Sequence, residues 1–437
     1  MSLPDKHPLN QPFVRKRAVI TGIGIISPIG SEKQEVTRSL RMGRSGVAPI
    51  TLFDASLLPT TIAAEVKDFN PQHLLRGMKV LDMTGDRRVL FANAAALLAV
   101  EDAGLSAQTL SADRGGVVFG AGLHPLIPRV ETILAQGISY GSEQEMNAMA
   151  KGVEESLSAP LWNRACLGTL SVANHYAIKG PCYTVVSACA ASSEAVGQSL
   201  RIIQRNDADL IITGGYDSML NPFFMEGFCG LGTMSVQNET PQEAMKPFDR
   251  RRDGFVLGEG AGVVILEEYE HALRRGAQIY AEVAGYGTSL DAYSVADPHP
   301  EGTGAVLAMS RAIKDAGIAT TDVEYINAHG TATIKNDRIE TAAIKKVFSD
   351  HAYKIPVSST KSMIGHTVAA AGILELIATV LGMNNDFIPP TINYQNPDPD
   401  CDLDYVPNHA RDGSFTCALS NSFGFGGQNS TLIIKKV

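Results

Sequence analysis

The sequence predicts an α/β fold in which helices cover sheets on both faces. Apolar runs that read as strands alternate along the chain with segments of helical periodicity. The strand-like runs are almost wholly apolar, which is typical of strands buried on both faces. The two halves of the chain begin with similar segments and end with similar segments, which indicates an internal duplication.

These repeated shapes divide the chain into two halves. Residues 17–27 read as a strand followed by a loop, and residues 279–289 repeat the strand, a Gly-x-Gly and a hydroxyl residue. Residues 255–266 and 423–434 are both glycine-rich loops that lead into an apolar strand. We therefore expect an N-terminal half over residues 14–272 and a C-terminal half over residues 273–437.

The elements between these markers follow the same alternation. Residues 89–103 have helical periodicity and stop before Gly104, and apolar residues at helical spacing follow Cys189. Residues 210–213 form the next predicted strand. Two further helices are predicted over residues 303–316 and 367–383.

Composition narrows the class of protein. A chain of 437 residues that is 44% hydrophobic can bury a large core. The net charge of −9 argues against general nucleic-acid binding. No apolar run approaches the roughly 20 residues that span a bilayer, so no membrane segment is expected. Residues 1–17 are polar and basic and predict a loose tail, not a signal peptide. Six cysteines without metal-ligand spacing predict free thiols, no metal site and a cytoplasmic location.

Two apparent motifs do not fit their usual chemistry. Gly22 and Gly24 nearly match a dinucleotide fingerprint, but Ser27 replaces the third glycine and no acidic residue follows about 20 positions later. Residues 358–361 match the S-x-x-K string of penicillin-recognising enzymes. That motif needs Ser and Lys on one helical face, whereas residues 355–359 read as a strand. Both interpretations are rejected.

Cys189 is the first candidate for chemistry. It stands where a short apolar strand runs through small residues into a helix. Unpaired backbone N–H groups and the positive end of the helix dipole favour a thiolate at such a position. A thiolate can accept an acyl group from a thioester. The alternative is an ordinary buried cysteine, which is the commoner role for a free thiol.

Two histidines and a glycine loop complete the set. His329 follows an apolar strand, with Thr331 and Thr333 at the next alternate positions, where they offer hydrogen bonds to an amide-bearing ligand. Lys361 and His366 follow another strand. The glycine-rich segment 421–427, which contains Phe423 and Phe425, offers backbone amides that could stabilise an oxyanion.

Taken together, these motifs resemble a known family. Residues 187–190, 327–333, 361–366 and 421–427 are similar, in order and spacing, to the β-ketoacyl-acyl carrier protein synthases, and residues 247–262 also fit. The closest likeness is to the elongating Cys-His-His type, synthase II. The resemblance runs from about residue 17 to residue 437.

The resemblance implies a thiolase-type fold with five layers, α-β-α-β-α, built from two similar halves and usually forming a homodimer. It implies that Cys189 accepts the acyl chain and that His329 and His366 assist decarboxylation of a malonyl thioester. Lys361 would support the second histidine electrostatically. No cofactor is implied, because the substrates are carried on the phosphopantetheine of an acyl carrier protein, which is the expected partner.

The resemblance also implies roles for the residues around the reacting groups. The amides of Cys189 and Phe425 would form the oxyanion hole, and the Phe425 ring would gate access. Thr331 and Thr333 would bind the pantetheine arm, which Phe423 would also contact.

Three departures from the family pattern leave the substrate open. Residues 334–337 lack the usual Pro and Gly, residues 428–430 replace Thr-Asn-Gly, and residues 160–164 replace a Pro-Phe-rich segment. Fatty acid elongation is the first expectation, and a specialised polyketide or polyene pathway is the alternative. A degradative thiolase would need a second cysteine inside the final glycine loop, and Cys417 lies upstream of it. A non-catalytic chain-length partner is disfavoured because such subunits typically lack the cysteine.

The densest basic cluster outside residues 250–252 is a candidate for carrier-protein docking. A solvated helix face explains the same charges equally well. Its members are Arg76, Lys79, Arg87 and Arg88.

Overall fold

The computed structural model describes residues 15–80, 86–106, 110, 113–122 and 165–437. Residues 1–14 of the predicted tail and the departure at residues 160–164 lie outside this part of the chain. Among the described residues, no helix is both long and apolar enough to cross a membrane.

Over the residues that the structure describes, the central sheet has ten strands, and each half of the chain supplies five of them. From one edge to the middle the order is β5 (Cys182–Val185), β4 (Gly115–Ala121), β6 (Leu210–Ser218), β7 (Glu259–Glu268) and β1 (Ala18–Ile26). From the middle to the other edge it is β8 (Ala281–Leu290), β14 (Gln428–Lys435), β13 (Cys417–Gly424), β9 (Tyr325–Asn327) and β10 (Val357–Ser358).

The two groups of strands have the same topology. In the N-terminal half β5, β4 and β6 are parallel to one another, β7 is antiparallel to β6, and β1 is antiparallel to β7. The C-terminal half repeats this pattern in the order β10, β9, β13, β14 and β8. In the described part of the chain, the two groups are joined by the pairing of Val19 and Ile20 with Glu282 and Ala281. The predicted division between residues 272 and 273 falls inside the short helix α10 (Tyr269–Arg274), which links β7 to β8.

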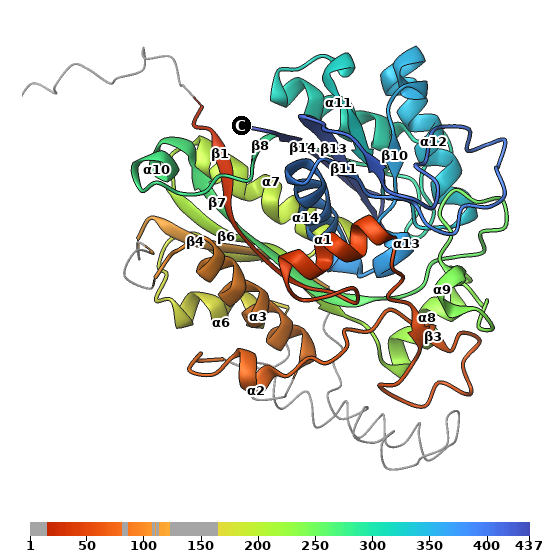
Figure 1. Ribbon diagram of the computed structural model, residues 1–437, viewed down its shortest axis with the longest axis horizontal. Helices are drawn as coiled ribbons and strands as arrows, with labels where there is room; N and C mark the ends of the chain where they lie inside the picture. Colours follow the sequence, from red (N-terminus) through yellow and green to blue (C-terminus); the bar gives the residue numbers. More distant parts are fainter. Residues whose placement is uncertain (1–14, 81–85, 107–109, 111–112, 123–164) are drawn as a thin grey trace, which may run out of the picture.

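Helices fill the space between the two groups of strands and cover their outer faces (Figure 1). The inner pair is α7 (Ala191–Gln204) and α14 (Ala371–Asn384), which contact each other and strands of both halves. The outer helices are α3 (Arg87–Asp102) and α6 (Leu167–His175) on one side and α11 (Thr303–Ala316) and α12 (Ile334–Phe348) on the other. This is the predicted five-layered α/β class.

The remaining elements are short and lie around this frame. The helices are α1 (Lys33–Met42), α2 (Pro71–Leu74), α8 (Pro222–Gly230), α9 (Pro241–Ala244) and α13 (Lys361–Ile364). Single 3-10 turns, η1 (Ala188–Ala190) and η4 (Val368–Ala370), precede the two inner helices, and η2 (Thr320–Asp322) and η3 (Ser349–Tyr353) flank β9 and α12. Two small two-stranded sheets pair β2 (Ala48–Pro49) with β3 (Ile62–Ala63) and β11 (Phe387–Ile388) with β12 (Arg411–Asp412).

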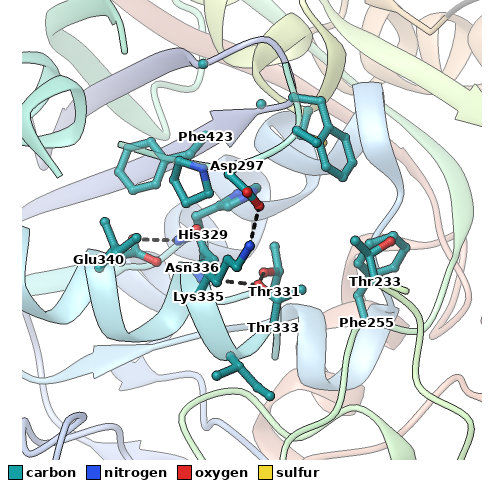
Figure 2. Close-up of a pocket in the computed structure, with 18 of the residues that line it drawn as sticks. Thr233, Phe255, Asp297, His329, Thr331, Thr333, Lys335, Asn336, Glu340 and Phe423 are labelled. Carbon is teal, nitrogen blue, oxygen red and sulfur yellow. Dashed lines mark hydrogen bonds and ion pairs between the residues drawn. The ribbon is translucent and has the colours of Figure 1, made fainter. Parts of the chain in front are cut away.

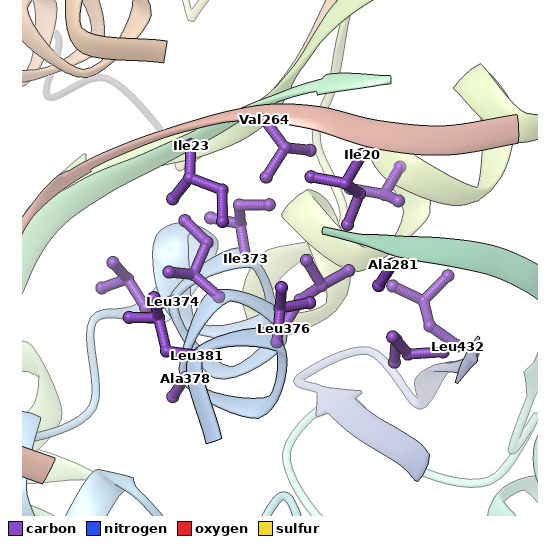
Figure 3. Packing of buried hydrophobic residues seen from close by; sticks show 14 of the residues in the cluster. Ile20, Ile23, Val264, Ala281, Ile373, Leu374, Leu376, Ala378, Leu381 and Leu432 are labelled. Atoms are coloured by element: carbon purple, nitrogen blue, oxygen red, sulfur yellow. The ribbon is translucent and has the colours of Figure 1, made fainter. Parts of the chain in front are cut away.

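The largest core cluster surrounds the inner helix α14. Figure 3 shows Ile373, Leu374 and Leu376 of this helix beneath Ile23 and Val264 of the adjoining strands. Residues 371–383 are buried all round, as expected for a helix with apolar residues on every side. A helix buried in this way is a rigid support for the loops at its N-terminal end, where the candidate site lies.

The predicted loop after the first strand is wrong, and packing explains why. β1 continues through Gly22 and Gly24. The helix α3 crosses the strand so closely at these two positions that only glycine fits there. A Cβ on Gly24 would lie 1.9 Å from the backbone O of Ala95. The second half repeats the contact, since a Cβ on Gly287 of β8 would lie 2.1 Å from Ala308 O of α11.

Gly24→Ala should therefore destabilise the fold. We expect a loss of about 3 kcal/mol in the free energy of unfolding, because the added methyl group meets rigid helix backbone. Gly227→Ala is the matched control, since Gly227 is exposed within α8 with nothing near its would-be Cβ. That change should stabilise the helix by up to about 1 kcal/mol. Equal unfolding midpoints in urea for the two variants would contradict the packing argument.

Candidate active site

One cavity of about 280 Å³ collects most of the residues that the sequence singles out. Cys189, His329 and His366 line it, although each is only 2–3% exposed. Figure 2 shows the side of the cavity formed by His329, Thr331, Thr333 and Phe423. The cavity lies between the halves, since Cys189 and Phe255 come from the first half and the histidines from the second.

Cys189 sits in a tight turn before the inner helix α7. Ala188 has φ 47°, a left-handed conformation that is uncommon for a residue with a side chain, and the 3-10 turn η1 carries the cysteine into the helix. The hairpin between β13 and β14 lies directly against this turn, because a Cβ on Gly424 would be 3.2 Å from Cys189 N. The backbone N–H of Phe425 donates a hydrogen bond to the cysteine sulfur.

The resting cysteine is a thiol, contrary to the expected thiolate. Burial raises the pKa of Cys189 to about 12, while the charge of Lys361 and the Phe425 N–H act in the opposite direction. The helix start alone therefore does not ionise this sulfur. A proton acceptor must take its proton during reaction.

His366 is the group placed to exchange that proton. Its Nε2 lies 3.2 Å from Cys189 Sγ, and its Nδ1 has no hydrogen-bond partner among the described residues. The backbone of His366 is held by the segment around Leu257, and its ring meets Phe255 edge-on at 5.2 Å. Burial and the charge of Lys361 hold the pKa of His366 well below its ordinary value, so the ring is neutral.

His329 is held in place by a buried carboxylate. Its backbone N–H donates to Glu340 Oε1 at 2.9 Å and the N–H of Gly330 donates to Oε2 at 2.8 Å. Its ring lies 5.5 Å from that of His366 and 5.6 Å from that of Phe423. Burial and the charge of Lys361 also lower the pKa of His329 far below its ordinary value. The cavity therefore presents two neutral imidazoles side by side.

Lys361 does not line the cavity but lies behind the histidines. Its fully buried Nζ forms an ion pair with Glu375 and lies 3.3 Å from His329 Nδ1. Lys361 therefore contacts His329, whereas the sequence predicted electrostatic support of His366. Its charge nevertheless lowers the pKa values of both rings. Burial raises the pKa of Glu375 to about 7.

The remaining predicted residues lie along the same cavity. The hydroxyls of Thr331 and Thr333 are 3.0 Å apart, and Thr333 also accepts the N–H of Asn336 at the start of α12. The Phe425 ring stacks on Phe228 of α8 with 6.3 Å between centroids. Both aromatic rings of the glycine loop, Phe423 and Phe425, line the cavity.

Sequence reasoning missed Glu340 and Glu375. Glu375 is the one charged residue in a mainly apolar helix, and such a carboxylate signals a buried cation nearby. Glu340 gave no such signal, because it lies among other charged residues of α12. Glu340 acts on the turn after β9, and that turn comes close to Glu340 only in the folded chain.

The predicted basic cluster is divided by the structure. Arg76 and Lys79 are exposed. Arg87 instead pairs with the buried Glu259 at 2.7 Å, and Arg88 is only 6% exposed and pairs with Asp86. Arg88 therefore lies in the interior, and Arg87, whose side chain is 30% exposed, is held by a buried carboxylate.

Comparison with known proteins agrees with this geometry. Residues 15–272 match the N-terminal domain of β-ketoacyl synthases and residues 280–395 match their C-terminal domain. The 3-oxoacyl-acyl-carrier-protein synthase 2 of Coxiella burnetii is 44% identical, over 97% of this chain and 99% of that protein. The protein of the same name from Synechocystis sp. is 43% identical, over 97% and 98%.

Solved structures give the same result. The ishigamide ketosynthase/chain length factor is 36% identical with a TM-score of 0.85, over 97% of this chain and 100% of that one. A β-ketoacyl synthase from Burkholderia phymatum is 32% identical with a TM-score of 0.82, over the same shares. The chain belongs to the β-ketoacyl synthase family of condensing enzymes.

Proposed function

We propose that this protein is a 3-oxoacyl-acyl-carrier-protein synthase that joins a Cys189-bound acyl chain to a malonyl thioester. The observation that carries the proposal is the contact of Cys189 Sγ with His366 Nε2 at 3.2 Å, with the neutral His329 ring beside it. The relatives named as synthase 2 support the same reaction.

The first step is transfer of the acyl chain. Cys189 Sγ attacks the thioester carbonyl, a new carbon–sulfur bond forms, and the carrier thiol leaves with the proton given up by the cysteine. His366 Nε2 is the nearest acceptor for that proton. The amide of Phe425, which already donates to the sulfur, and the amide of Cys189 stabilise the oxyanion as it develops.

The second step is condensation. Malonyl thioester loses CO2, and the electron pair of the broken carbon–carbon bond moves into an enolate. The enolate carbon attacks the acyl carbonyl, the Cys189 sulfur leaves as a thiolate and takes up one proton from solvent by way of His366, and a 3-oxoacyl thioester remains. Neutral N–H groups of His329 and His366 can donate to the enolate oxygen, which is favourable because they act only where charge develops. No free cofactor is needed, because both acyl groups arrive on phosphopantetheine.

Intact-mass analysis tests both steps. Incubation with acyl-carrier protein should add one acyl group, and malonyl-carrier protein should then discharge it as 3-oxoacyl product. His329→Ala should still take up the acyl group but lower condensation by at least about 100-fold, since one oxyanion donor is lost. Cys229→Ala, at a partly buried cysteine outside the cavity, is the control that keeps both steps. Acylation without condensation in the unaltered protein would contradict the proposal.

Elongation in fatty acid synthesis is the pathway we propose first, with a cytoplasmic location. A specialised pathway is the second candidate, favoured by the 36% identity to the ishigamide ketosynthase/chain length factor. Saturated and polyunsaturated acyl-carrier proteins of equal length, offered in competition, separate the two. Preferential acylation by the unsaturated chain would favour the specialised pathway.

We further propose that two copies associate through the free edge of β5. Among the described residues this strand ends the sheet order and pairs with β4 alone, which leaves one side of its backbone open. Apolar side chains stand beside the edge, with Tyr183 40%, Val186 47% and Leu170 of α6 45% exposed. A second β5 would pair with it about a two-fold axis and cover them.

Light scattering on purified protein checks this association. The unaltered chain should have the mass of a dimer, and Tyr183→Lys combined with Leu170→Lys should shift it to monomer. Leu273→Lys, at a 49% exposed leucine of α10, is the control that stays dimeric. A monomeric unaltered protein would contradict the homodimer and favour a heterodimer.

A further inference from the structure

Four side chains at alternate positions lead from the buried end of the cavity to its rim. All of them line the cavity: His329, Thr331, Thr333 and Lys335. Their exposure rises in this order, from 3% at His329 and 5% at Thr331, through the half-buried Thr333, to 60% for the side chain of Lys335. The segment therefore presents imidazole, hydroxyl and ammonium groups in sequence toward solvent.

Lys335 is unusual among the cavity residues. Of the described residues that line the cavity, it alone carries a permanent positive charge. Its Nζ lies 2.7 Å from Asp297 Oδ1, which belongs to a separate segment of the rim (Figure 2). The position also lies in residues 334–337, where the sequence departs from the family pattern.

We propose that Lys335 binds the phosphate of the phosphopantetheine arm and exchanges Asp297 for it when the carrier arrives. This inference rests on the proposed function. The arm carries a thioester at its end, amides along its length and a phosphate where it meets the carrier. The cavity offers Cys189 and His329 to the first group, the two threonine hydroxyls to the second and Lys335 to the third.

The exchange of partners has little energetic cost. An ion pair with both side chains about half exposed contributes only about 1 kcal/mol or less, because solvent screens it. The phosphate takes the place of the Asp297 carboxylate, so the ammonium group of Lys335 always has an anion beside it. Asp297 thus keeps Lys335 at the rim between turnovers without blocking the phosphate.

The experiment compares two small substrates that differ only in the phosphate. Enzyme acylated at Cys189 is given malonyl-phosphopantetheine or malonyl-pantetheine, and the ratio of their kcat/KM values is measured. We expect a ratio of about three to five for the unaltered protein, as one exposed ion pair gives, and a ratio near one for Lys335→Ala. Lys346→Ala is the control, since this exposed lysine lies on the same helix away from the cavity and should keep the full ratio. Asp297→Asn should raise the ratio, because it frees Lys335.

Two outcomes would overturn the inference. The first is an unchanged ratio in Lys335→Ala. The second is a loss confined to malonyl-carrier protein, which would assign Lys335 to the acidic surface of the carrier and not to the phosphate. Calorimetric titration of phosphopantetheine itself into the same variants keeps this test separate from the proposed function. Tighter binding to the unaltered protein than to Lys335→Ala would support the inference even in a protein that condenses nothing.

Discussion

Cys189→Ala should abolish acylation and lower condensation by at least about 1,000-fold, while the protein stays folded. The reason is that the other described groups near the reacting carbonyl, His329 and His366, are imidazoles placed to donate and accept protons. The substitution removes a single buried sulfur, so the expected loss of stability is about 1 kcal/mol. Intact-mass analysis after incubation with acyl-carrier protein measures the first effect, and urea unfolding the second. An alanine variant that still takes up one acyl group would refute Cys189 as the nucleophile.

The pH dependence of Cys189 alkylation sharpens this prediction. Because burial raises the pKa of Cys189 to about 12, the sulfur should react slowly with iodoacetamide at neutral pH and faster as pH rises. Its apparent pKa should lie above the value of about 8.5 for an ordinary thiol. An apparent pKa below 7 would mean that the helix start, which the sequence alone suggested, and the charge of Lys361 together outweigh burial.

Local periodicity predicts most of the framework correctly. The helix expected over residues 303–316 coincides with α11, and the one expected over residues 89–103 differs from α3 by two residues at its start and one at its end. Apolar strands and helix-length segments carry their own signal, so these elements need no knowledge of the tertiary structure. Cys189 and the two histidines stand close to such elements, which is why the sequence singles them out, and the structure places all three at one cavity.

Features that depend on packing between distant segments escape such reasoning. Gly22 and Gly24 resemble a turn, yet they are strand residues that let α3 approach. Arg88 resembles a surface charge, yet it is buried beside Asp86. The expected electrostatic effect of Lys361 on His366 is present, but the contact of its Nζ with His329 was not foreseen, because α13 and α14 bring it between that ring and Glu375. For the glycines and Lys361 the contact comes from a segment distant in sequence, whereas Arg88 pairs with its near neighbour Asp86 and only its burial depends on the rest of the fold.

The buried pair of Lys361 and Glu375 gives the second large effect. Lys361→Met leaves Glu375 as an unpaired carboxyl in a fully buried position, which should cost about 3–5 kcal/mol of stability. The loss should depend on pH with a definite sign. Burial already raises the pKa of Glu375 to about 7, far above its value in the unfolded chain, and removing the cation raises it further. The unfolded carboxyl therefore ionises first, so the variant should lose stability as pH rises above about 4.5 and regain it in acid.

Lys361→Met should also change catalysis in a way that misfolding does not explain. The charge of Lys361 lowers the pKa values of His329 and His366, so its removal should raise both and move the acidic limb of the condensation profile to higher pH. The double variant Lys361→Met with Glu375→Gln removes the unpaired charge and should recover most of the stability while keeping the shifted limb. Lys354→Met, at an exposed lysine, is the control for both measurements. If the double variant folds and its acidic limb matches that of the unaltered protein, then Lys361 does not hold the histidines neutral, and their low pKa values come from burial alone.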